Sequence, residues 1–106
     1  MKVAIINVRI IDTKNNIDEV GGILINEKGL IEACGSKVTK GNVGDTKIYD
    51  CKNKLAIPGV VDGRVFAGEP GFEYKENYRT LSQAAISGGV TSVVTMPNTN
   101  PIIDNV

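Results

Sequence analysis

Apolar and polar residues alternate loosely at the start of the chain, over residues 2–11. The spacing of Val3 and Ile5, and then of Val8 and Ile10, suits a strand with one buried face. Polar residues 12–16 predict a turn. The pattern that follows predicts a strand at 22–25, a hairpin turn at 26–29 with Gly29 at positive φ, a strand at 30–33, a loop at 35–45 and a short strand at 47–51.

The pattern changes in the second half of the chain. Residues 55–61 are almost all apolar, which predicts a strand covered on both faces, as in a parallel sheet. Glycines and a proline mark a loop at 63–71. From Lys75 the apolar spacing becomes helical, glycines 88–89 end the helix, and 90–96 form a second β-rich run. The apolar helix positions are Tyr78, Leu81, Ala84 and Ala85. Strand, helix and strand in succession predict a βαβ unit, so the fold class is α/β.

Length and charge narrow the classes of protein. The 106 residues fit one domain, and the change of pattern near 53–54 divides them into segments 1–54 and 55–106. Twelve Lys and Arg balance twelve Asp and Glu, so no basic excess predicts nucleic-acid binding. No apolar run approaches the ~20 residues of a membrane span, and the first residues lack a signal-peptide core. We expect a cytoplasmic protein.

The chain has no histidine, and its only cysteines are Cys34 and Cys51. Serine and cysteine triads with an imidazole base are therefore excluded. The commonest zinc ligand is missing as well, and two cysteines do not make a cysteine-rich zinc site. Neither cysteine has a basic cluster near it in the sequence, so both are expected to pack at the edge of a core rather than to act as nucleophiles.

Four blocks of the second half carry a family resemblance. They read IPGVVD at 57–62, EPGFEYKE at 69–76, AAISGGVT at 84–91 and MPNTNP at 96–101. In these blocks the chain resembles dihydroorotases of the amidohydrolase superfamily. The resemblance implies that residues 1–54 belong to a small amino-terminal β-domain, a partial β-sandwich. It implies that residues 55–106 form the first strand, helix and strand of a truncated (β/α)8 barrel of the TIM type.

The resemblance also implies where a zinc site would lie. The first barrel strand of the family ends Asp-x-His-x-His, with an arginine two residues further on that holds the substrate carboxylate. Side chains at i and i+2 share one face of a strand, so two such histidines reach one ion. In this sequence Arg64 and Phe66 occupy the histidine positions, and Gly68 occupies the arginine position.

These replacements exclude metal chemistry at that position. Arg64 has no lone pair because guanidinium stays protonated, and Phe66 is apolar. At ~4 Å and an effective dielectric constant of ~20, Arg64 would repel a cation by several kcal/mol. We therefore expect no zinc, no other cofactor and no catalytic residue. A complete barrel also needs ~250 residues, and the family's remaining ligands and its catalytic aspartate come from later strands.

Three further polar residues have alternative interpretations. Asn98 matches a family asparagine that helps to hold the substrate carboxylate, so it is a candidate for a vestigial substrate contact. The alternative is that Asn98 is an ordinary turn residue between Pro97 and Pro101. Asp62 and Glu69 are a candidate pair of catalytic carboxylates. The alternative is that they are ordinary acidic residues of a loop near a helix start. In each case the structural role is favoured.

Two hypotheses for function follow. The first is an inactive remnant of a zinc-dependent cyclic amidohydrolase of pyrimidine biosynthesis. The active enzyme interconverts carbamoyl-aspartate and dihydroorotate. Such a remnant could be the product of a decaying gene. The alternative is a non-catalytic structural partner of aspartate carbamoyltransferase. A third possibility is a fragment that complements a separately encoded remainder. Because two barrel strands and one helix cannot cover the apolar run at 55–61, we also expect marginal stability and self-association.

Overall fold

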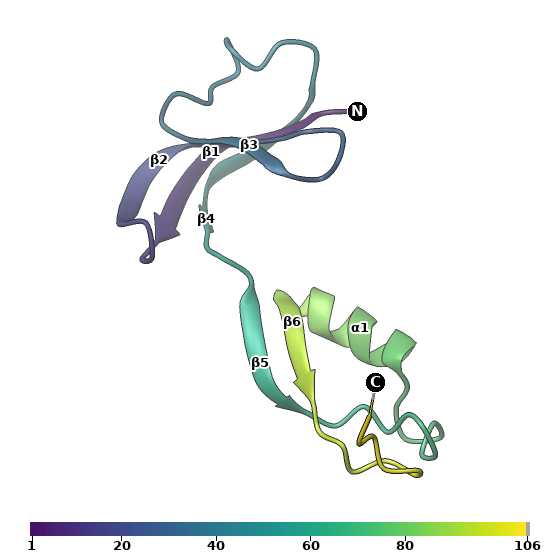
Figure 1. Cartoon of the computed structure of the whole chain (residues 1–106). Coiled ribbons are helices and arrows are strands. Elements are labelled where there is room, and N and C mark those ends of the chain that lie inside the picture. The colour runs from purple at the N-terminus through teal and green to yellow at the C-terminus, as the bar shows by residue number, and fades with distance from the viewer. Residues whose placement is uncertain (106) are drawn as a thin grey trace. The chain divides into compact units, whose positions relative to one another are not determined.

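The computed structural model describes residues 1–105, which fall into two compact units, Met1–Pro58 and the part of Gly59–Val106 that is described. The ribbon in Figure 1 follows the chain through both units. The elements are β1 (Val3–Asp12), β2 (Ile17–Ile25), β3 (Ile31–Gly35), β4 (Lys47–Ala56), β5 (Val60–Val65), α1 (Tyr78–Ser87) and β6 (Val90–Thr95). Within residues 1–105 no helix is long and apolar enough to cross a membrane.

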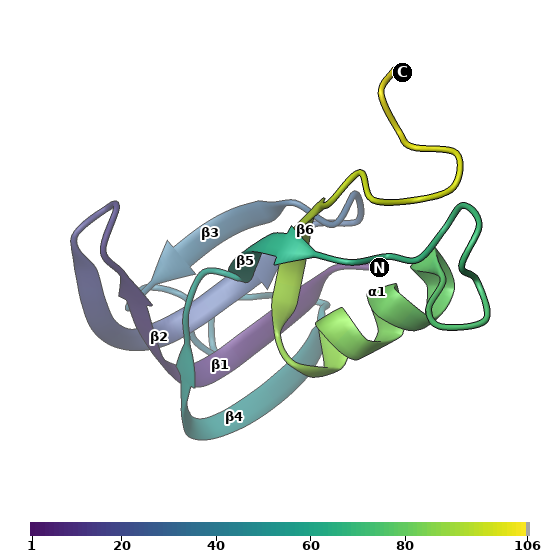
Figure 2. The same ribbon diagram turned by 90° about the horizontal axis from the view of Figure 1, so that it is seen from below.

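The first unit is a single four-stranded sheet in the order β3-β2-β1-β4. β1 pairs antiparallel with β2, and β2 pairs antiparallel with β3. β4 pairs parallel with β1, which makes the sheet mixed, and Figure 2 shows β1 running between β2 and β4. The second layer that a β-sandwich requires is not among the described residues of this unit.

Side-chain hydrogen bonds form the two predicted turns. The Asp12 carboxylate accepts hydrogen bonds from the backbone N–H groups of Lys14 at 3.0 Å and of Asn15 at 3.3 Å. In the second hairpin the Asn26 side chain accepts from the N–H of Lys28 at 2.9 Å, and Gly29 adopts φ +77°. Such Asx turns stabilise a tight reversal locally. The predicted hairpin at 26–29, with Gly29 at positive φ, is confirmed.

At the start of β1 the core of the first unit lies on the face of Ala4 and Ile6, not on the predicted face of Val3 and Ile5. Ala4 and Ile6 are buried and pack with Val38 and Val43 from the loop before β4. The prediction that Val3 and Ile5 form the buried face together with Val8 and Ile10 is wrong for its first half. The reason is that Val38 and Val43 of the loop before β4 cover Ala4 and Ile6. The register with β2 shifts further along, at Asn7, which adopts φ +54°.

The second unit is a parallel strand, helix and strand. β5 and β6 pair in parallel, and α1 connects them and lies beside β6 (Figure 1). The helix begins with a capping box, in which the Asn77 side chain accepts from the N–H of Thr80 at 3.0 Å and the Thr80 hydroxyl accepts from the N–H of Asn77 at 3.2 Å. The predicted βαβ unit is confirmed.

The prediction of one buried strand over residues 55–61 is wrong. Leu55 belongs to the end of β4 and Val61 to β5, and their exposed fractions are 57% and 65%. Pro58 and Gly59 separate the two strands because proline has no N–H to offer a sheet. The two compact units accordingly divide after Pro58, whereas the change of sequence pattern placed the boundary after Lys54.

Close backbone packing at Gly21 provides a test of the first sheet. A Cβ at Gly21 would fall on the backbone of Gly35, whereas a Cβ at Gly41 would meet only the Thr39 hydroxyl, at 4.0 Å. We predict that Gly21→Ala destabilises the first unit by about 1–3 kcal/mol, as overpacking does. Gly41→Ala is the matched control, with an expected effect between none and a stabilisation of about 1 kcal/mol. Amide hydrogen exchange of β1 measures both, and equal effects of the two substitutions would contradict the packing described.

Candidate functional site

The carboxyl ends of β5 and β6 carry the candidate site, in the two loops that follow these strands. The register between the strands shifts between Asp62 and Val65, but their ends remain paired, because the N–H of Met96 donates to the carbonyl of Val65 at 2.8 Å. Just beyond them lie Ala67 and Thr99, the buried residues among positions 59–105, with exposed fractions of 1% and 5%. Polar groups at the carboxyl ends of parallel strands are where α/β proteins place their binding sites.

Backbone hydrogen bonds fold the first loop and tie it to the second. Gly68, at φ +74°, accepts at its carbonyl from the N–H of Phe72 at 2.7 Å. The N–H of Asn100 donates to the carbonyl of Pro70 at 2.9 Å. Gly71 lies so close to Asn100 that a side chain at position 71 would meet its backbone. The two loops therefore form one connected structure.

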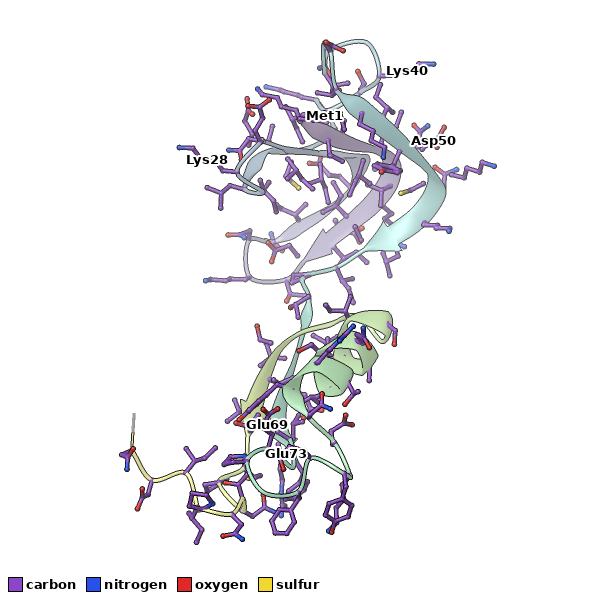
Figure 3. All side chains as sticks on the ribbon, turned by 90° about the vertical axis from the view of Figure 1, so that its right-hand side faces the viewer. Met1, Lys28, Lys40, Asp50, Glu69 and Glu73 are labelled. Atoms are coloured by element: carbon purple, nitrogen blue, oxygen red, sulfur yellow. The ribbon has the colours of Figure 1, made fainter. Side chains whose placement is uncertain are left out.

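The glutamates of the first loop bind backbone and hydroxyl donors near the start of α1. Glu69 accepts from the N–H of Tyr78, the first helical residue, at 2.9 Å. Glu73 accepts from the N–H of Gly71 at 3.0 Å, and this bond lowers the pKa of Glu73 below its ordinary value. Glu76 accepts from the hydroxyl of Thr80. Figure 3 labels Glu69 and Glu73, which both lie in this loop. The acids therefore act as local structural acceptors.

An open cavity of about 310 Å³ lies between the two loops. Its lining brings together three positions that the sequence singled out, Phe66, Gly68 and Asn98. Phe72, Lys75 and Glu76 complete the lining. Arg64 does not line the cavity, but its guanidinium carbon lies 5.7 Å from the centroid of the Phe66 ring. The side chains at positions 64 and 66 thus lie close together, although Phe66 follows the last residue of β5 and the pairing with β6 is irregular between Asp62 and Val65.

Lys75 is exposed and also lines the open cavity, which the sequence did not predict for it, nor for Phe72 and Glu76. Its ammonium nitrogen lies 5.1 Å from the Phe72 ring centroid and 5.5 Å from that of Tyr74, both within cation–π range. The N–H of Lys75 donates to the carbonyl of Phe72 at 2.9 Å. The spacing of three residues between Phe72 and Lys75 is the feature of the sequence from which this turn could have been predicted.

The donor chemistry at positions 64 and 66 does not fit a zinc ion. A guanidinium and a phenyl ring offer no lone pair to a metal. The Asp62 carboxylate instead accepts from the backbone N–H of Arg64 at 3.1 Å. In the described part of the chain no three His, Cys, Asp or Glu side chains converge in a way that could hold a metal ion.

The first unit has its own cavity, of about 240 Å³ and mostly apolar. Ile10, Ile23 and Cys34 are among its lining residues. Partial burial raises the pKa of the Cys34 thiol, and the charges of Glu19 and Asp12 raise it further. A raised thiol pKa means less thiolate at neutral pH, so this environment does not activate Cys34 as a nucleophile.

Comparison with known proteins reveals relatives over the whole chain. It is 41% identical over 105 residues to a dihydroorotase of Pelobacter propionicus, 41% identical over 107 residues to one of Chlorobaculum tepidum, and 42% identical over 106 residues to one of Syntrophus aciditrophicus. Each match covers 99% of this chain and 24% of the relative. No protein-family model matches the chain.

The second unit is a βαβ unit whose polar loops lie at the carboxyl ends of its strands. This arrangement is the one in which α/β proteins form their binding sites. The relatives identify its ancestry more closely. The chain is homologous to dihydroorotases over its whole length and spans about a quarter of theirs.

The hydrogen bond between Glu73 and Gly71 predicts a pH dependence of the first loop. Because the folded-state pKa of Glu73 is lowered, its contribution to stability is present above the unfolded value of about 4.3 and is lost as the pH falls through the folded value. We expect the Gly71 amide resonance to titrate with a midpoint below the ordinary glutamate pKa. Glu73→Gln should abolish that titration. A midpoint at or above the ordinary glutamate value would contradict the hydrogen bond.

Proposed function

We propose that this chain is a dihydroorotase-like segment with no zinc-dependent activity, derived from an enzyme of pyrimidine biosynthesis. The observation that carries the proposal is the pair Arg64 and Phe66 at the end of β5. The family resemblance assigns two histidine ligands to these positions, and the 5.7 Å approach of the guanidinium to the ring places the two side chains close together. With a cation and a hydrocarbon there, no zinc ion binds and no water is activated.

The other two family positions in the cavity agree with loss of the substrate site. Gly68 stands where the family has the arginine that grips the substrate carboxylate. Asn98 lines the same cavity as Gly68. A substrate carboxylate there would therefore meet the Asn98 amide but not the arginine guanidinium that binds it through two hydrogen bonds. Lys75 supplies a positive charge there, and the adjacent Glu76 offsets it. We infer that Asn98 is a vestigial contact.

The same proposal assigns the finer architecture. β5, α1 and β6 correspond to the first strand, helix and second strand of a (β/α)8 barrel, and the mixed sheet of the first unit corresponds to part of a β-sandwich. Parallel pairing of β5 with β6 through a connecting helix supports the first assignment. In this architecture the cavity lies where barrel enzymes place their active sites, at the carboxyl ends of the strands.

A structural role beside aspartate carbamoyltransferase is the second candidate function. Its support is the exposure of apolar side chains on β5 and β6, of which Val61 is 65% and Val94 53% exposed. Exposed apolar residues on adjacent strands favour contact with another protein. This role requires no metal and is compatible with the loss of activity.

Metal content tests the proposal directly. We predict that the purified chain, equilibrated with zinc and desalted, retains much less than one zinc per chain. It should also give no dihydroorotate from carbamoyl-aspartate above a blank. The matched variant is Arg64→His with Phe66→His, which should bind cobalt(II) more tightly than the unaltered chain but still weakly, because the family's other ligands come from later strands. One zinc per unaltered chain, or measurable turnover, would refute the proposal.

A complementary experiment separates the two replacements from the length of the chain. In the Pelobacter propionicus dihydroorotase, the residues that align with Arg64 and Phe66 are changed to Arg and Phe. Removal of two metal ligands should abolish zinc binding and lower the rate of cyclisation at least about 1000-fold, because a metal-activated nucleophile is lost. Retained zinc and a rate close to that of the unaltered enzyme would show that these positions do not hold the metal.

A further inference from the structure

The peptide bond between Asp62 and Gly63 lies where β5 departs from regular pairing. Asp62 is opposite Val93 of β6, and the next pair along the strands is Val65 with Thr95. Two residues of β5 but only one of β6 lie between these pairs, so the pairing here is irregular, as at a β-bulge. Because a bulge disrupts the ladder locally, the backbone that follows Asp62 is held less firmly than that of a regular strand.

The Asp62 side chain folds forward over the peptide group that follows it. Its carboxylate accepts a hydrogen bond from the N–H of Arg64 at 3.1 Å. A side-chain hydrogen bond to the backbone two residues on forms an Asx turn, and this turn brings the carboxyl carbon, Cγ, toward the intervening backbone nitrogen of Gly63. Asp62 and Gly63 are both exposed. Apart from its two neighbours in the sequence, no part of the chain lies within 4 Å of the position that a Cβ of Gly63 would take.

The glycine distinguishes this Asx turn from two others in the chain. The carboxylates of Asp12 and Asp50 also accept from the N–H two residues on, that of Lys14 at 3.0 Å and that of Lys52 at 2.9 Å. A threonine follows the first of these aspartates and a cysteine follows the second, and both side chains crowd the backbone nitrogen. Gly63 has no side chain, so its nitrogen is accessible and the backbone around it rotates freely.

We propose that Asp62–Gly63 is a site of spontaneous isoaspartate formation in the folded chain. The backbone nitrogen of Gly63 bonds to Cγ of the protonated Asp62 carboxyl, and the hydroxyl group of that carboxyl leaves with the proton of the nitrogen as water. The product is a cyclic succinimide. Water then adds to either carbonyl carbon of the ring and breaks its bond to the nitrogen, which restores aspartate or gives isoaspartate. The reaction is a rearrangement, so the mass of the chain is unchanged.

Isoaspartate at position 62 changes the backbone that leads to Arg64 and Phe66. The main chain then runs through Cγ, so it is longer by a methylene group, and the original backbone carbonyl becomes a free carboxylate. The Asx turn that binds the N–H of Arg64 is lost with the original side chain. The reaction needs only this dipeptide and water, so it does not depend on the proposed function.

Peptide mapping tests the proposal on the whole folded chain, incubated at physiological temperature and pH. Mass spectrometry with electron-transfer fragmentation distinguishes isoaspartate from aspartate at each position. Isoaspartate should accumulate at Asp62 at least about tenfold faster than at Asp12 or Asp50, because only glycine leaves the attacking nitrogen unhindered. A peptide of residues 60–66 is the unfolded reference, and the folded chain should react within about tenfold of its rate, because the irregular pairing leaves the backbone free to rotate.

Variants at the two positions separate the chemistry from the fold. Gly63→Val should slow the reaction about tenfold or more, because a β-branched side chain crowds the nitrogen. Asp62→Asn should speed it, because ammonia leaves from a neutral amide, and Asp62→Glu should abolish it, because the ring that forms is larger. Equal isoaspartate at Asp62, Asp12 and Asp50 would overturn the proposal. So would a folded chain that reacts far more slowly than the peptide, or a rate unchanged by Gly63→Val.

Discussion

The pairing of the end of β5 with β6 is the constraint on which the candidate site depends. Arg64 lies in β5 and Phe66 just beyond it, and 5.7 Å separates the guanidinium carbon from the ring centroid. Parallel pairing with β6 holds the end of the strand, through the 2.8 Å hydrogen bond between Met96 and Val65. Whatever residues occupy positions 64 and 66 therefore act together, and here they are a cation and an aromatic ring.

Much of the fold could be predicted because its signals are local. The Asn26 to Gly29 hairpin, the helix that begins after Asn77, and the parallel pairing across it follow from turn chemistry, capping and periodicity. The buried face at the start of β1 could not be predicted, because it depends on Val38 and Val43, which come from a loop more than 30 residues away along the chain. The division between Leu55 and Val61 was missed because apolar residues alone do not reveal where a strand ends.

The candidate site shows the same difference. The sequence motifs identified Phe66, Gly68 and Asn98, and the structure brings them to one cavity. Phe72, Lys75 and Glu76 complete the lining, and the sequence did not predict this because their places depend on a turn in an irregular loop. The central claim is that positions 64 and 66 hold no metal. An anomalous difference map from crystals soaked in zinc salt, recorded at the zinc absorption edge, tests it most directly. The account predicts no peak beside these two side chains, and a strong peak there would contradict it.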